Sequence, residues 1–356
     1  LSLFIGNDAN SGATAETAVK TLPEAVTRLA ETGGTVIFAD YYRVGANLTL
    51  PAYAKPITFT SITFESGAPR AGFEFTASRK VITLGGPTVF KTIKLDATYR
   101  GTVMNTNGGN IPFLVANWND VTMESGVETY GMLMFVGGRY GATTNDDAAK
   151  TVTFTFAGLT AKAVGADDAK TTYPSFRYLY LGDAEAKYLG GDKDAAENIT
   201  VANKTVTAVL DGVTAQNVVT VSASSAPVSV RTTDNAVSLT LTGACEIANL
   251  YTGWSNTSNK TTGDAYVDTL SIEIGSDATV TDSMRLYNAR NLTLNIAAHD
   301  ASHRITAPIQ ILLNDVYAPT GTERATLTYG THSIDGKTAL PTVGDGYTAT
   351  VNKTEE

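Results

Sequence analysis

Carboxylates are the residues of this chain with the clearest catalytic potential. Asp183 and Glu185 stand two positions apart, so on a β-strand their side chains would share one face. Glycoside hydrolysis needs two carboxylates that face each other at a defined separation. Asp183 and Glu185 are therefore the candidate catalytic residues, and a solvated acidic rim is the structural alternative. Further carboxylates lie nearby in the sequence, at Asp146, Asp147, Asp167, Asp168, Asp192 and Asp194.

Aromatic residues gather in the same part of the sequence. Tyr178 and Tyr180 alternate along a predicted strand, and Tyr188 follows. Flat rings exposed on a sheet can stack against sugar faces, whereas large aromatic residues also pack beneath long loops. Trp118 and Trp254 each lie among polar residues and are two further candidates. These five aromatic residues predict a carbohydrate-binding surface.

Metal and cofactor motifs are weak. His299 and His303 would share a face of a helix, but they lie between two apolar runs, where a turn is expected. The segment Asp8-Ala9-Asn10-Ser11-Gly12 resembles the start of a calcium loop without its distal glutamate, so a turn is the simpler interpretation. We expect no metal site and no cofactor, with calcium left open.

Composition excludes several classes of partner. The chain of 356 residues has a net charge of −9 and no basic block, which argues against nucleic acid as a partner. No apolar run is long enough for a transmembrane helix, so membrane insertion is not expected. Cys245 is the only cysteine and is expected to be a buried apolar side chain. The first residues lack a signal peptide, so we expect a mature or excised fragment of a longer protein.

One short helix is predicted near the N-terminus, over residues 21–32. Thr21 and Glu24 form a capping-box pattern, and Pro23 lies in the first turn. Apolar residues then recur on one helical face, and Gly33 can end the helix. A helix of this length depends on packing, so we expect it to cover the open end of the sheet that begins at residues 35–38.

Short strand-like runs separated by turn residues fill the rest of the chain. Many such runs predict an all-β solenoid, sandwich or barrel, and a spacing of about 20 to 30 residues between corresponding runs suits one coil per repeat. The capping helix favours the solenoid. Within one run, Val206, Ala208 and Leu210 are expected to face inward, and Thr207 and Val209 outward.

The N-terminal segment resembles a known family. Asn7–Gly12, Thr17–Val26 and Gly33-Gly34-Thr35-Val36-Ile37 are similar to the N-terminal cap of right-handed parallel β-helices of the pectin-lyase-like type. The resemblance covers about the first forty residues and implies a fold more than an activity. The family includes polysaccharide lyases and hydrolases, and also large bacterial surface proteins. The Gly-His-Gly segment of its hydrolases and the calcium-binding acidic cluster of its lyases have no match in this chain.

We therefore expect an all-β, right-handed parallel β-helix with a short N-terminal capping helix. Residues 1–34 form the cap, and residues 35–318 form the β-helix, with longer excursions at 138–200. Residues 319–356 form a few antiparallel strands that close the solenoid, or a small appended domain. The expected function is an extracellular bacterial surface module that binds carbohydrate or acts as an adhesin within a larger protein. The alternatives are a polysaccharide hydrolase or lyase, which would use carboxylates from residues 139–194, and a purely structural stalk.

Overall fold

The structure, a computed structural model, describes most of the chain. The described residues are 6–14, 16–99, 102–103, 111–141, 144–165, 170–184, 199–222, 230–253, 266–299, 305–313, 320–330, 334 and 341–354. The chain divides into two compact units, which we call unit 1 (Leu1–Phe135 with Thr155–Ser175) and unit 2 (Val136–Phe154 with Phe176–Glu356). The chain passes between the units within strands β14 (Leu133–Val136) and β15 (Lys150–Ala157) and just before β18 (Phe176–Tyr180).

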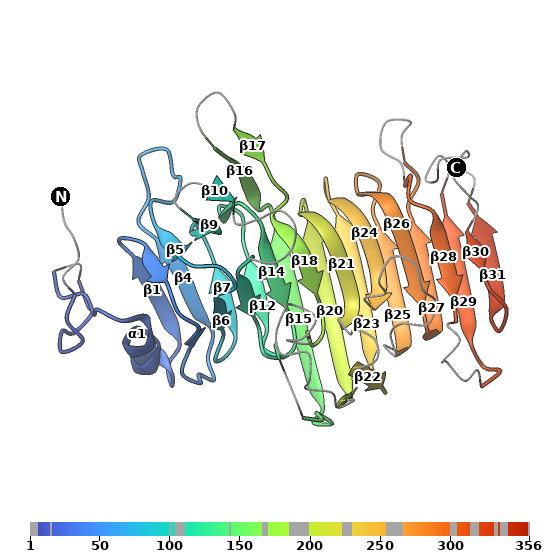
Figure 1. Ribbon diagram of the computed structural model, residues 1–356, viewed down its shortest axis with the longest axis horizontal. Coiled ribbons are helices and arrows are strands. Elements are labelled where there is room, and N and C mark those ends of the chain that lie inside the picture. The colour runs from blue at the N-terminus through green and yellow to red at the C-terminus, as the bar shows by residue number, and fades with distance from the viewer. Residues whose placement is uncertain are drawn as a thin grey trace. The chain divides into compact units, whose positions relative to one another are not determined.

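Unit 1 is a coil of short strands that pass in turn through three sheets (Figure 1). The first contains β1 (Gly34–Phe38), β4 (Ile57–Ser61), β7 (Thr88–Phe90) and β12 (Val121–Met123). The second contains β3 (Leu48–Thr49), β6 (Val81–Thr83) and β11 (Phe113–Val115). The third contains β2 (Tyr42–Val44), β5 (Gly72–Phe75), β8 (Lys94–Asp96), β13 (Glu128–Tyr130), β16 (Thr160–Val164) and the antiparallel β17 (Thr171–Thr172). A small antiparallel pair, β9 (Thr98–Tyr99) and β10 (Thr102–Val103), follows β8.

Unit 2 alternates between two long parallel sheets. One contains β20 (Lys204–Asp211), β23 (Ala236–Thr242), β25 (Val267–Ile274), β27 (Ala289–Ile296), β29 (Arg324–Tyr329) and β31 (Thr348–Lys353). The other contains β18, β21 (Thr214–Ser222), β24 (Glu246–Gly253), β26 (Thr279–Tyr287), β28 (Ile309–Leu312) and β30 (Thr342–Val343). The strands β19 (Ile199–Ala202) and β22 (Val230–Thr233) form a separate parallel pair. Because each strand pairs in parallel with its counterpart one coil earlier, the fold is a parallel β-helix, as predicted.

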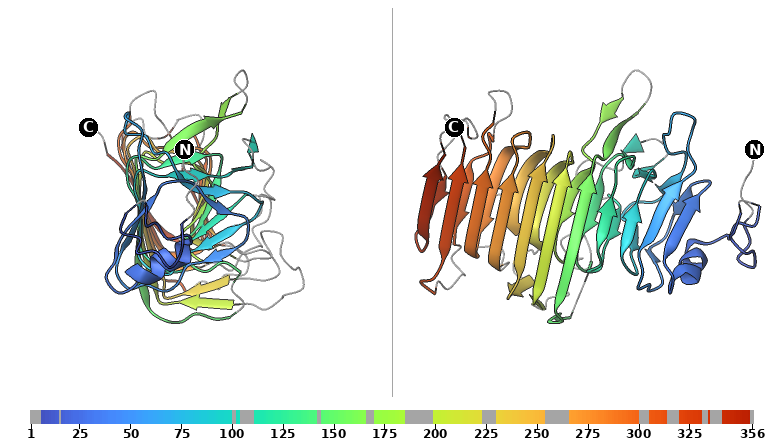
Figure 2. Two further views of the ribbon diagram at one scale, coloured as in Figure 1. Left: turned by 90° about the vertical axis from the view of Figure 1, so that its left-hand side faces the viewer. Right: turned by 180° about the vertical axis from the view of Figure 1, so that it is seen from behind.

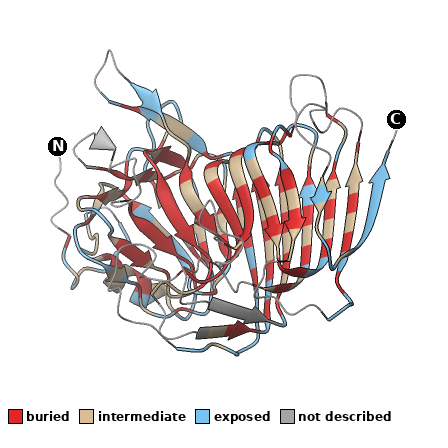
Figure 3. Ribbon diagram, turned by 45° about the vertical axis from the view of Figure 1, so that its right-hand side comes forward, coloured by how far each residue is buried: buried red, intermediate tan, exposed pale blue. Residues whose placement is uncertain are grey.

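The core of unit 2 is built from stacked apolar rows. Ala208, Leu239, Ile272, Leu294 and Leu327 lie in register on successive strands, and each is at most 2% exposed. The residues between the inward rows are intermediate or exposed, so buried and partly exposed positions alternate along the strands (Figure 3). This alternation confirms the predicted inward and outward faces of β20.

The predicted capping helix is present as α1 (Leu22–Leu29), next to β1 in unit 1 (Figure 2). The Thr21 side chain accepts from the Glu24 backbone N–H at 3.4 Å, as the capping pattern predicts. Glu24 does not reach back, because its carboxylate binds Arg28 at 2.7 Å. Asp8 accepts the Thr21 backbone N–H instead, at 2.8 Å. Gly33 ends the helix with a φ of 70°, which an L side chain rarely adopts.

Two expectations about the chain's organisation need revision. The predicted antiparallel strands at the C-terminal end are wrong, because β29 pairs with β27 and β31 pairs with β29 in parallel. The solenoid pattern therefore continues through residue 353. Part of the range 138–200 is also regular, since β15, β16 and β18 are strands of the long sheets.

Candidate functional site

Asp183, a predicted catalytic residue, is buried in an ion pair. Its side chain is 1% exposed. Arg139 donates to Asp183 Oδ2 from Nε at 3.0 Å and from Nη2 at 2.8 Å, and the Arg139 backbone N–H donates to Oδ1. Burial raises the pKa of Asp183, and Arg139 opposes that shift. The carboxylate thus has its hydrogen-bonding capacity occupied by Arg139 and does not face solvent.

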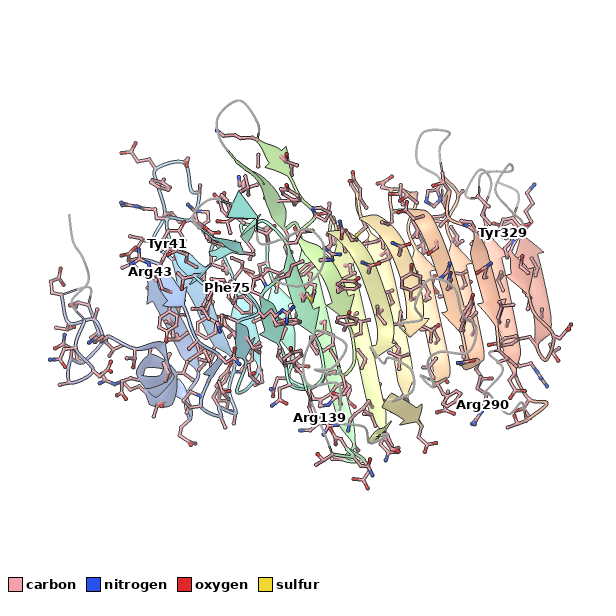
Figure 4. The ribbon with its side chains drawn as sticks, in the orientation of Figure 1. Tyr41, Arg43, Phe75, Arg139, Arg290 and Tyr329 are labelled. Carbon is pink, nitrogen blue, oxygen red and sulfur yellow. The ribbon has the colours of Figure 1, made fainter. Side chains whose placement is uncertain are left out.

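The ion pair belongs to a larger, partly buried cluster in unit 2, built from Arg139, Asp146, Asp183 and Lys204 (Arg139 is labelled in Figure 4). Lys204 Nζ lies 2.9 Å from Asp146 Oδ1, and Arg139 Nε lies 3.6 Å from Asp146 Oδ2. Burial acts to raise the pKa of Asp146, but the hydrogen bond and charge of Lys204 and the charge of Arg139 outweigh it and hold the pKa below its ordinary value. Two cations therefore balance two anions, which is the pattern of a structural cluster.

The predicted aromatic platform is not an open surface in the described part of the chain. The rings of Tyr178 and Tyr180 stack with 5.4 Å between their centroids, but Tyr180 is 0% exposed. Trp118 is 6% exposed. The other predicted site residues, Glu185, Tyr188 and Trp254, lie outside the described residues. The structure thus brings Tyr178 and Tyr180 together and places Trp118 elsewhere, in unit 1.

The remaining motifs are accounted for by backbone contacts. The ring nitrogens of His299 lie 2.7 Å from the Ala297 carbonyl oxygen and 2.9 Å from that of Ala278, and His303 is outside the described residues. Cys245 is buried, as expected. Within the described ranges, no group of three or more His, Cys, Asp or Glu side chains could hold a metal ion. The same residues include no helix with the length and apolar character needed to cross a membrane.

A different group of side chains, in unit 1, has the properties of a ligand site. We call it the tyrosine–lysine face, and it consists of Tyr41, Phe64, Glu74, Lys94, Asp96, Glu128 and Tyr130. Its frame is the third sheet, where Glu74 pairs with Asp96 and Asp96 with Tyr130 on neighbouring strands. Lys94 pairs in the same way with Glu128 and with Gly72. A Cβ atom at Gly72 would lie 2.0 Å from the Lys94 carbonyl oxygen, so only glycine permits this approach of the two strands.

Lys94 is the centre of the tyrosine–lysine face. Its ammonium nitrogen lies 5.4 Å from the ring centroid of Tyr130 and 5.8 Å from the centroids of both Tyr41 and Phe64. Phe64 reaches the face from a tight hairpin, in which its backbone N–H donates to the Ala68 carbonyl. Each ring attracts the cation through its quadrupole. The ammonium makes no hydrogen bond or ion pair with a described residue. The three rings therefore hold its N–H donors in position, and no described residue accepts from them.

Two carboxylates on the face differ in their environments. Glu128 is nearly buried, and it binds Lys162 Nζ at 2.9 Å and the Tyr130 hydroxyl at 2.8 Å. Asp96 is half-buried, and burial raises its pKa although Thr98 donates two hydrogen bonds to Oδ1. The other oxygen of Asp96 accepts no hydrogen bond from the described residues. Burial and the charge of Asp96 also raise the pKa of Tyr41 to about 12, so its hydroxyl stays protonated and can donate.

Reasoning from the sequence missed this face because its members come from four separate coils. Lys94 and Asp96 share a three-residue strand, and Glu128 and Tyr130 share another. Two alternating polar pairs 34 residues apart match the length of one coil, and this spacing was the available signal. Comparisons of the whole chain with protein-family models, curated proteins and solved structures found no match in any of the three.

Proposed function

We propose that the chain is a glycan-binding module and that the tyrosine–lysine face of unit 1 is its binding surface. The observation that carries this proposal is the Lys94 ammonium, which three aromatic rings hold on a half-exposed face without a hydrogen bond to a described residue. The resemblance of the N-terminal segment to the pectin-lyase-like cap supports an extracellular bacterial setting, as part of a larger surface protein.

The chemistry of the face matches a ligand rich in hydroxyl groups. Aromatic rings such as Phe64, which is 50% exposed, can pack against the apolar face of a sugar ring. Lys94 and the Tyr41 hydroxyl can donate hydrogen bonds to sugar oxygens, while the second oxygen of Asp96 can accept from a sugar hydroxyl. A few fixed polar groups among aromatic rings are typical of ligand-binding sites.

Affinity gels and a glycan array test the proposal with the full chain. We expect wild type to be retained by at least one glycan and the Lys94→Met variant to bind that glycan about tenfold or more weakly, because a charged hydrogen bond contributes about 1.5 to 3 kcal/mol. Lys91→Met is the matched control, since Lys91 is exposed and paired with Glu124 in the same unit. Equal binding by all three proteins would exclude the face as the site. A wild-type chain that binds no glycan would favour the structural stalk.

A polysaccharide hydrolase is the second candidate, and the pairing of Glu74 with Asp96 on neighbouring strands favours it. The raised pKa of Asp96 suits a general acid, and the adjacent glutamate could serve as base or nucleophile. Incubation with the retained glycan distinguishes the two functions. Release of reducing ends by wild type, lost in Asp96→Asn, would establish hydrolysis, and retention of an intact glycan would establish binding alone.

A further inference from the structure

Unit 2 contains a guanidinium group, that of Arg177, to which the described residues supply no counter-charge. Arg177 lies on β18, and its Nε and Nη1 atoms are buried without a hydrogen-bond partner among the described residues. Its guanidinium carbon lies 5.7 Å from the ring centroid of Tyr178. Arginine cannot lose its proton inside a protein, so the charge remains although these donors are unsatisfied. A buried polar group of this kind requires an explanation, because leaving it unsatisfied costs free energy.

The strands next to Arg177 offer it no carboxylate. Arg177 is the only charged residue on β18, and the paired strand β21 has none. The next strand, β24, carries Glu246, which pairs with Thr214 and is exposed. Strand β24 lies two strands from β18, at a spacing of about 4.8 Å per strand. Among the described residues, no ion pair includes Arg177.

A ladder of polar side chains starts at the Arg177 backbone and crosses the neighbouring strands. Asn217, opposite Tyr178, donates to the Arg177 carbonyl at 3.0 Å. Asn249 donates to Asn217 Oδ1 at 3.2 Å, and Ser283 donates to Asn249 Oδ1 at 2.8 Å. The ladder of three polar side chains thus crosses three strands and fixes the backbone carbonyl of Arg177.

We propose that Arg177 binds an oxyanion, a carboxylate or a tetrahedral sulfate or phosphate group, at the outer face of β18 and β21. The guanidinium fork matches such groups and forms charge-assisted hydrogen bonds with them. The Tyr178 ring covers one side of the guanidinium and limits its hydration. This site is in unit 2, is independent of the tyrosine–lysine face, and gives the protein a preference for anionic ligands that its net charge of −9 does not suggest.

Thermal unfolding of the full chain in sodium sulfate, phosphate, acetate and chloride at equal ionic strength tests this proposal. Sulfate and phosphate stabilise folded proteins in general, so the readout is the saturable part of the midpoint shift. We expect wild type to show a saturable increase of a few degrees that is lost in Arg177→Met. Comparing acetate with the tetrahedral anions distinguishes a carboxylate site from a sulfate or phosphate site.

Arg285→Met is the matched control. Arg285 lies on β26 of the same sheet, contacts the Tyr251 ring at 6.0 Å, and has no buried unsatisfied nitrogen. Its variant should keep the saturable shift, and a loss in both variants would overturn the proposal in favour of general screening.

In chloride alone, Arg177→Met should be as stable as wild type or more so, because it removes an unpaired charge. A midpoint several degrees lower in chloride, or no saturable shift in wild type, would overturn the proposal. If Arg177→Met does not fold, Arg177→Gln replaces it.

Discussion

Inside unit 2, Arg139 contacts both carboxylate oxygens of Asp183 and opposes the rise in pKa that burial causes. The sequence pattern made Asp183 a candidate catalytic residue. A catalytic and a structural carboxylate differ in the groups that face them. Here the facing group is Arg139, which lies 44 positions from Asp183 in the sequence. A carboxylate with an occupied hydrogen-bonding capacity and 1% exposure belongs to the framework of the fold.

Removing the charge of Asp183 should therefore be costly. In Asp183→Asn, the partly buried Arg139 loses its closest charged partner, and we expect a loss of about 3 kcal/mol in the free energy of unfolding. Urea titration followed by circular dichroism measures this loss. Arg290→Gln is the control, because its ion pair with Asp268 is 2.8 Å long but solvent-accessible and should contribute about 1 kcal/mol or less. Equal losses in the two variants would contradict the structural role of Asp183.

The lowered pKa of Asp146 predicts how the stability of the protein depends on pH. The pKa of Asp146 in the folded protein lies below its ordinary value, so the carboxylate contributes stability above that ordinary value, and the contribution is lost as the pH falls through the folded-state pKa. Asp146→Asn should flatten this part of the acid limb. Unfolding midpoints of wild type and variant, measured from about pH 2 to about pH 6, test the prediction. Parallel curves would show that Asp146 does not titrate differently on folding.

At the scale of elements, α1 was predictable because its signals are local. Thr21, Pro23 and Gly33 act within one or two turns of the helix, so the sequence alone indicated both ends to within three residues. The role of Asp8 was not predictable, because that residue approaches Thr21 only after the N-terminal segment folds back. The Thr21 backbone N–H, which Glu24 would bind in a capping box, is therefore bound by the distant Asp8 carboxylate.

The cap of α1 can be tested by two threonine substitutions in the same helix region. Thr21→Ala removes the side-chain acceptor of the Glu24 N–H and should cost about 1 kcal/mol of stability. Thr27→Ala should be neutral or slightly stabilising, because Thr27 is exposed and its hydroxyl bonds only to the Pro23 carbonyl within the helix. Denaturant unfolding of both variants provides the comparison, and a larger loss in Thr27→Ala would refute the assignment of the cap.

The strands show what the sequence can and cannot reveal. The alternation of residue types in β20 correctly assigned Val206, Ala208 and Leu210 to the core, because successive side chains of one strand point to opposite faces. The tyrosine–lysine face could not be assembled in this way. Lys94, Glu128 and Tyr130 become neighbours only through the register between β8 and β13, and the lengths of the intervening turns set that register.

At the scale of the whole molecule, a solenoid is stabilised mainly between neighbouring coils. In the sheet of unit 2 that runs from β20 to β31, each strand pairs only with its neighbours in the preceding and following coils. Stability is then close to a sum of coil and interface contributions. A change at the last coil should consequently have a smaller effect than a change of similar chemistry in a central coil.

Removal of residues 341–356 tests this property directly. The truncated chain lacks β30 and β31, whose residues are partly or fully exposed, and it exposes the edges of β28 and β29. We expect it to keep its β-sheet circular dichroism and to unfold only a few degrees below wild type. Ile272→Asp, which places a charge in a fully buried row of β25, should by contrast remove most of the folded structure of unit 2. If truncation unfolds the chain as completely as Ile272→Asp does, stability is not additive over coils, because the last coil would then be required for all the others.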